Sequence, residues 1–238
     1  RHTGMAILLN PLQGEAYLQL ARLCFLEGRG NQAIDALVSQ ALRARPYDGD
    51  VLFSAGWHYL QLYRPDKAEA LWKKAFADPG QHQLRVIAAS CPHVPASTFI
   101  AMFQPDWSTL EDIWRRYQTE GSDDDRQALL IHGWQEAEKA EQRGDQKASR
   151  HWMVLARMAS QWERPDLVLT ASDRAVRLAP ESHAARRVRA LALFEERKFA
   201  AAEADLRWCL ARKRDDPNAQ RKLAAAVNAQ SDLAAEAR

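Results

Sequence analysis

Histidine, cysteine and acidic side chains in this chain do not stand at the spacings that catalytic or metal sites need. The seven histidines are scattered, and no H-E-x-x-H pattern places two imidazoles beside a general base. His132 and His151 lie in helical segments, where we expect ordinary surface or packing roles. Cys24, Cys91 and Cys209 form no C-x2-C pair, so we expect buried helical thiols. We therefore predict no catalytic residue, no metal and no cofactor.

Two short patterns resemble ligand motifs without having their context. Cys91-Pro92-His93 could suggest a haem or metal site, but a lone C-P-H at a helix end is more typical of a helix stop, because proline has no N–H to donate. Gly28 and Gly30 form a single G-x-G between two helical segments, and no strand precedes it as a phosphate loop would require. The sequence thus predicts a protein that binds, and not an enzyme.

One candidate binding surface is aromatic and lies in the N-terminal part of the chain. Trp57 follows Gly56 on a helical segment, close to Phe53, and Arg22 and Phe25 occupy the equivalent place in the preceding segment. Aromatic and arginine side chains are the usual anchors of binding surfaces. We therefore predict an apolar, aromatic groove that includes these four positions: Arg22, Phe25, Phe53 and Trp57.

An alternative for these aromatic residues stays open at this point. The segment 81–117 could fold back over them and bury them. Three of the eight tryptophans, Trp72, Trp134 and Trp152, have alanine and leucine neighbours at helical spacing, and we expect them in the core.

A second candidate surface is basic. Residues 150–214 contain 14 lysines and arginines against 8 aspartates and glutamates. A concave basic strip that includes Arg150, Met153, Arg157 and Arg187 could contact acidic peptides, anionic glycans or a membrane surface. The alternative is a solvated face of ion pairs. The net charge of +2 and the absence of interleaved aromatic residues argue against nucleic acid.

These candidates must be positioned by helices. The chain has 47% hydrophobic and 27% charged residues, which is typical of a folded protein. Its ten prolines mostly separate helical segments, alternating β-branched strands are absent, and no apolar run is long enough to span a membrane. We predict an all-α fold.

A helix, a short break and a second helix recur along the chain. The clearest unit places small and large apolar residues in a fixed order, namely Leu52, Ala55, Gly56, Tyr59, Ala68, Trp72, Ala75, Phe76 and Pro79. This order resembles the tetratricopeptide repeat. The resemblance implies an αα-superhelical solenoid that binds a protein or peptide partner through its concave face.

The repeats suggest three parts: N-terminal units in residues 1–79, a divergent helical joint in 80–121, and C-terminal units with a capping helix in 122–238. Within the joint, Asp106 is a plausible N-cap for a helix. In the first unit, residues 14–46, the interval from Ala33 to Ala41 is one residue longer than the repeat expects, which predicts an irregular second helix.

A further resemblance concerns residues 10–17, 103–107 and 207–210, which are similar to repeat regions of bacterial O-antigen ligase or polymerase-like membrane proteins. This implies an accessory domain beside a glycan-processing membrane enzyme, and hence membrane association. A free-standing protein would instead be expected in the cytoplasm. Because the chain begins at Arg1 and residues 6–11 look like the tail of a helix, we expect a fragment of a longer protein.

Overall fold

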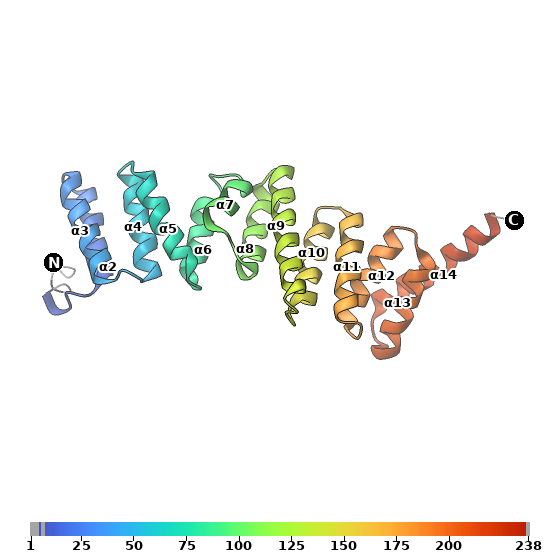
Figure 1. Cartoon of the computed structure of the whole chain (residues 1–238). Coiled ribbons are helices and arrows are strands. Elements are labelled where there is room, and N and C mark those ends of the chain that lie inside the picture. The colour runs from blue at the N-terminus through green and yellow to red at the C-terminus, as the bar shows by residue number, and fades with distance from the viewer. Residues whose placement is uncertain (1–4, 6–7, 237–238) are drawn as a thin grey trace. The chain divides into compact units, whose positions relative to one another are not determined.

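A computed structural model of the chain describes residue 5 and residues 8–236, with side chains to residue 231. These residues contain thirteen helices, α2 to α14, and no strand (Figure 1), so the predicted all-α class is confirmed. None of these helices is long and apolar enough to cross a membrane. The helix tail predicted at 6–11 lies partly outside the described residues.

The chain divides into two compact units. Unit 1 comprises residues 1–105 with 115–120, and unit 2 comprises 106–114 with 121–238. The helix α8 (Trp107–Glu120) contributes residues to both units. The three-part division expected from the repeats stays a prediction.

Unit 1 is built from consecutive helix pairs. Its first pair packs as an antiparallel hairpin, the second pair packs against it, and both α2 and α3 contact α4. The next helix, α6, contacts α4 and α5, and α7 contacts α5. The helices are α2 (Gly14–Leu26), α3 (Asn31–Ala44), α4 (Gly49–Gln61), α5 (Pro65–Ala77), α6 (Gln81–Ser90) and α7 (Ala96–Phe103).

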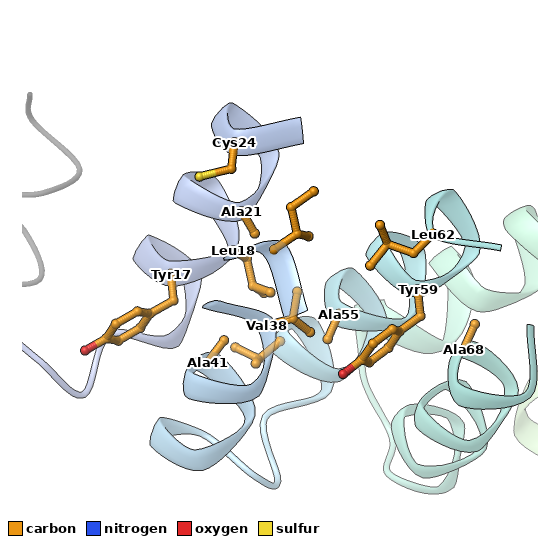
Figure 2. Close-up of a cluster of buried hydrophobic side chains, with 12 residues drawn as sticks. Tyr17, Leu18, Ala21, Cys24, Val38, Ala41, Ala55, Tyr59, Leu62 and Ala68 are labelled. Carbon is orange, nitrogen blue, oxygen red and sulfur yellow. The ribbon is translucent and has the colours of Figure 1, made fainter. Parts of the chain in front are cut away.

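Small residues allow these helices to approach closely. Ala21, Ala41 and Ala55 are fully buried where α2, α3 and α4 meet, and Tyr17 and Tyr59 fill the space beside them (Figure 2). Because a larger side chain at an alanine site would push two helix backbones apart, these positions fix the spacing within unit 1.

The predicted irregularity of the second helix is wrong. The helix α3 is continuous over 14 residues, and the additional residue lies in the turn before it, which has four residues where the turn after α4 has three. As a result Ile34, and not Ala33, points into the core; Ile34 is 1% exposed and Ala33 is exposed. A turn absorbs an insertion more readily than a helix, since no i→i−4 ladder has to shift.

The same C-terminal cap ends five helices of the chain. In the turn after α4, the N–H of Arg64 donates to the carbonyl of Tyr59 and the N–H of Tyr63 donates to that of Leu60. This pair of bonds is a Schellman motif, which needs one residue in the left-handed conformation. That residue is Gly28, Tyr63, Gly144, Glu163 or Arg197 in the five turns, with φ between 56° and 68°.

Tyr63→Gly is expected to stabilise the protein by about 0.5–1 kcal/mol, because glycine adopts positive φ without the penalty of a Cβ atom. The Tyr63 side chain is 94% exposed, so little packing is lost. The matched control is Tyr47→Gly, an equally exposed tyrosine without a positive φ, which should lower stability. Urea denaturation of both variants measures the difference; a loss of stability in Tyr63→Gly would contradict the expectation.

Unit 2 continues the same construction. Neighbouring helices pack against each other from α9 to α14, and α12 also contacts α10 and α14. The helices are α9 (Asp123–Gln142), α10 (Ala148–Gln161), α11 (Pro165–Leu178), α12 (His183–Glu195), α13 (Phe199–Arg212) and α14 (Pro217–Glu236). The helix α14 packs against α12 and α13, and its role as a capping helix stays a prediction.

The predicted N-cap at Asp106 is confirmed, and Ser122 caps the next helix. The carboxylate of Asp106 accepts hydrogen bonds from the backbone N–H groups of Ser108 and Thr109, at 3.0 and 3.3 Å. The hydroxyl of Ser122 accepts from the N–H of Asp125, whose carboxylate accepts in turn from the N–H of Ser122. These caps satisfy amides that a helix leaves unpaired, so they fix where α8 and α9 begin.

Candidate binding grooves

The structure has a groove in unit 1 and another in unit 2, and the walls of both come mainly from alternate helices of the chain. The groove of unit 1, here called the aromatic groove, has a volume of about 750 Å³ and is lined by α2, α4 and α6. Its lining residues are Glu15, Leu18, Gln19, Arg22, Asp50, Phe53, Ser54, Trp57, His58, Gln61, Arg85, Ala88 and Ala89.

Three aromatic rings form a stack at the wall of this groove. Trp72 of α5 stacks on Phe53 with ring centroids 5.6 Å apart, and on Trp57 with centroids 6.3 Å apart. The Trp72 indole N–H donates a 3.0 Å hydrogen bond to the carbonyl oxygen of Phe53. Trp72 is buried whereas Trp57 remains 47% exposed, so a rigid core residue holds an exposed ring in place.

Gly56 makes this stack possible. A Cβ atom built at Gly56 would overlap the indole ring of Trp72 and would lie 3.3 Å from the carbonyl oxygen of Ala68. The glycine therefore lets α5 place its tryptophan directly on the backbone of α4. This agrees with the close approach that the sequence predicts at Gly56 and Ala68.

Of the two arginines that line the aromatic groove, Arg85 has an ion-pair partner and Arg22 has none within the described residues. Arg85 of α6 donates to the carboxylate of Asp50 at 2.9 Å and lies over the Phe53 ring, 4.3 Å from its centroid. Arg22 forms no ion pair or hydrogen bond within the described residues. The groove therefore contains one free guanidinium, that of Arg22, and one exposed indole, that of Trp57.

The segment after residue 80 does not close over the aromatic groove. Its first helix, α6, contributes Arg85, Ala88 and Ala89 to one wall, and Trp57 stays exposed. Phe53 is the aromatic residue that does become buried, beneath Arg85 and beside Trp72. Trp57 thus stays accessible, as an open aromatic groove requires, whereas Phe53 is covered by the segment that follows residue 80.

Burial lowers the pKa of His58, which lines the aromatic groove, and of His151, whose ring packs against Trp107 at 4.4 Å. As the pH falls through the ordinary histidine pKa of 6.5, the two imidazoles are protonated in the unfolded chain while they are still neutral in the folded chain. Protonation therefore favours the unfolded chain. Stability should therefore fall as the pH drops from 7.5 to 5.5. Urea denaturation at both pH values measures this slope, and the double variant His58→Gln with His151→Gln should flatten it. An unchanged slope in the double variant would contradict the assignment.

The groove of unit 2, here called the apolar groove, has a volume of about 980 Å³. Its walls are formed mainly by α10 and α12, which contribute both apolar and charged side chains. Its lining residues are Glu111, Arg150, Met153, Val154, Ala156, Arg157, Ser160, Glu163, Arg164, Pro165, Val168, Val188, Leu191, Ala192, Glu195, Asn218 and Lys222.

The structure brings together six of the eight predicted site residues, in two groups. Arg22, Phe53 and Trp57 line the aromatic groove, and Arg150, Met153 and Arg157 line the apolar groove. The other two line neither groove. Phe25 is 42% exposed on α2, and Arg187 pairs with the carboxylate of Asp216 at 3.3 Å.

Several lining residues were not predicted. Ser54, His58 and Gln61 belong to the same helix face as Trp57, and the spacing of three or four residues could have identified them. Arg85 could not be found in this way, because its segment lacks the repeat pattern. Val188 and Leu191 also lay outside the prediction, which considered only the basic positions of their helix.

Many arginines of unit 2 form ion pairs. Arg186 and Arg189 share the carboxylate of Asp205, which is only 2% exposed, at distances of 3.0 and 2.6 Å. The bond to Asp205 raises the pKa of Arg189. Arg174 pairs with two glutamates and lies over the ring of Trp152, 4.7 Å from its centroid. The local excess of basic residues therefore contributes less free positive charge than its composition suggests.

The described residues contain no cluster of histidine, cysteine and acidic side chains able to hold a metal ion. All three cysteines are buried and free, as the sequence predicts. Burial raises the pKa of the Cys91 thiol to about 11, so this thiol is protonated and a poor nucleophile at neutral pH.

No family model and no curated protein matches the chain. Among solved structures, it is similar to the APC/C hetero-tetramer Cut9–Hcn1, with 15% identity over 94% of this chain and 44% of that chain and a TM-score of 0.44. YrrB, described as a TPR protein with an unusual peptide-binding site, has 14% identity over 93% of this chain and 97% of its own, with a TM-score of 0.42. TTC0263, a TPR protein of Thermus thermophilus, has 15% identity, coverages of 90% and 98%, and a TM-score of 0.38. The chain spans less than half of the first of these proteins.

The fold class rests on the helices of the chain itself. Pairs of 13- or 14-residue helices are joined by turns of three or four residues, and the first helix of a pair contacts the first helix of the next, as α2 contacts α4 and α10 contacts α12. Within each unit, the described residues thus form an αα-solenoid of tetratricopeptide-like helix pairs.

Proposed function

We propose that this protein is a non-catalytic scaffold that holds a peptide segment of a protein partner in the aromatic groove. The observation that carries the proposal is the exposed ring of Trp57, which is held on the buried Trp72 and lines the same groove as the unpaired Arg22. An indole fixed in this way loses little conformational entropy on binding, and tryptophan and arginine are frequent binding hot spots.

The remaining lining residues favour a peptide over a compact small molecule. Gln19 and Gln61 carry amide groups on two neighbouring helices, where they can bond to the backbone of an extended chain. The groove extends across three helices and has a volume of about 750 Å³, so it suits a segment several residues long. The free guanidinium of Arg22 favours an acidic residue next to the apolar side chain that contacts Trp57.

The proposal is tested by selecting peptides from a display library on the full chain, then measuring the affinity of the best binder for variants. Trp57→Ala and Arg22→Ala should each weaken binding by at least tenfold. Tyr63→Ala is the matched control, because it removes an exposed aromatic ring outside the groove. Equal affinity for Trp57→Ala and Tyr63→Ala would contradict the proposal.

A second candidate function comes from the sequence likeness at residues 10–17, 103–107 and 207–210: an accessory domain of an O-antigen ligase-like membrane enzyme. In that setting the partner segment would belong to the glycan-processing machinery. The test is the sequence upstream of Arg1, which should encode about ten membrane-spanning helices, each about 20 apolar residues long. An upstream region without such helices would exclude this candidate.

A further inference from the structure

The apolar groove runs along the full length of α10. Its lining residues on this helix, from Arg150 through Met153, Val154 and Arg157 to Ser160, are spaced by three or four and form a single stripe. On α12, the residues Val188, Leu191, Ala192 and Glu195 form a matching stripe. Between Arg150 and Glu163, the apolar residues Met153, Val154 and Ala156 of α10 and Val188, Leu191 and Ala192 of α12 line the groove, and the charge of Arg157 is neutralised by its ion pair with Glu111.

Five of the seven charged residues that line this groove already have a partner of opposite charge. Arg157 pairs with Glu111 at 2.7 Å, Lys222 pairs with Glu195 at 2.9 Å, and Arg164 pairs with Asp166 at 2.9 Å. Arg150 and Glu163 are the other two, and neither forms an ion pair within the described residues. One cation and one anion are thus available to a ligand.

These two charges stand at opposite ends of the groove. Arg150 is the third residue of α10, and Glu163 follows two residues after the end of this helix. A helix rises 1.5 Å per residue, so thirteen positions separate their backbones by roughly 20 Å. An extended peptide covers the same distance in about six residues.

We propose that the apolar groove binds an extended peptide segment in a single orientation. An acidic residue of the segment pairs with Arg150, a basic residue about six positions away pairs with Glu163, and leucine- or valine-type side chains between them contact Met153 and Leu191. Burial of the apolar side chains supplies most of the affinity. The two end charges determine orientation, since the reversed segment would place like charges together at both ends. This inference rests on the proposed role as a peptide-binding scaffold but does not involve the aromatic groove.

The probes are two fluorescent nine-residue peptides with blocked termini, which carry no terminal charges. Both have leucine and valine at the centre and aspartate at position 2; one has arginine at position 8, and the other has aspartate there. Fluorescence anisotropy with the full chain should show at least a tenfold preference for the peptide that carries one aspartate and one arginine. The substitution Glu163→Arg, which makes both ends of the groove basic, should reverse this preference.

The control is Glu196→Arg, the same substitution at a carboxylate outside the groove, which should leave the preference unchanged. Equal affinity for the two peptides, no binding of either at millimolar concentration, or a preference that survives Glu163→Arg would overturn the inference. If Trp57→Ala abolished binding and Glu163→Arg had no effect, the peptide would lie in the aromatic groove, which would overturn this inference and leave the proposed function intact.

Discussion

Trp72→Ala is expected to destabilise the protein by about 3–5 kcal/mol and to remove binding in the aromatic groove, because a large buried ring is replaced by a cavity. The indole of Trp72 is 6% exposed and stacks on both Phe53 and Trp57. Without it, the backbone of Gly56 faces an empty space and Trp57 loses the surface that fixes its ring.

Urea denaturation gives the change in the free energy of unfolding for this variant. Trp162→Ala is the comparison, because Trp162 is only half-buried and its indole N–H bonds to the exposed Asp123 at 3.2 Å. Trp72→Phe keeps an aromatic ring against Gly56 and should restore most of the lost stability. If Trp72→Ala lowers the free energy of unfolding by no more than Trp162→Ala does, the aromatic stack does not stabilise unit 1.

Asp205→Ala is expected to cost about 3 kcal/mol, because it leaves the partly buried guanidinium of Arg186 without a carboxylate and that of Arg189 with only the half-exposed Asp173, at 3.3 Å. Arg189 donates to both oxygens of Asp205, at 2.6 and 2.8 Å, and Arg186 donates to one of them at 3.0 Å. These bonds connect α12 to α13. Removal of one member of such a buried cluster is costly even where the intact cluster adds little net stability.

The matched control for this prediction is Asp166→Ala, which breaks the solvent-exposed pair with Arg164. Solvent screens that pair, so the control should change stability little. Thermal or urea unfolding of both variants measures the difference. Equal small losses for the two aspartates would contradict the assignment of Asp205 as a buried anchor.

The sequence predicted the elements where a local signal decides the structure. Asp106 starts a helix because its side chain accepts hydrogen bonds from free amides, and the helices before Pro46 and Pro79 end ahead of the prolines. Ala33 was misplaced because a repeat pattern counts residues without showing whether an additional one lies in a helix or in a turn. The structure places the additional residue in the turn around Gly28.

Some features of the candidate sites follow from the repeat pattern, and others depend on contacts between residues far apart in the sequence. Arg22 and Trp57 lie in one groove because they occupy equivalent positions on equivalent helices, which the repeat reveals. The pairing of Arg187 with Asp216, 29 residues away, depends on how α12 packs near the start of α14. Such a contact follows from the tertiary structure, and the excess of basic residues alone could not indicate it.

Photo-crosslinking tests most directly whether a partner segment binds to the first helix of each pair. A photoreactive amino acid is placed at Gln19, which lines the aromatic groove on α2, or at Lys74, which is exposed on α5 outside the groove. With the library-selected peptide bound, we predict strong crosslinking from position 19 and none from position 74. Crosslinking from position 74 alone would contradict binding through the first helices.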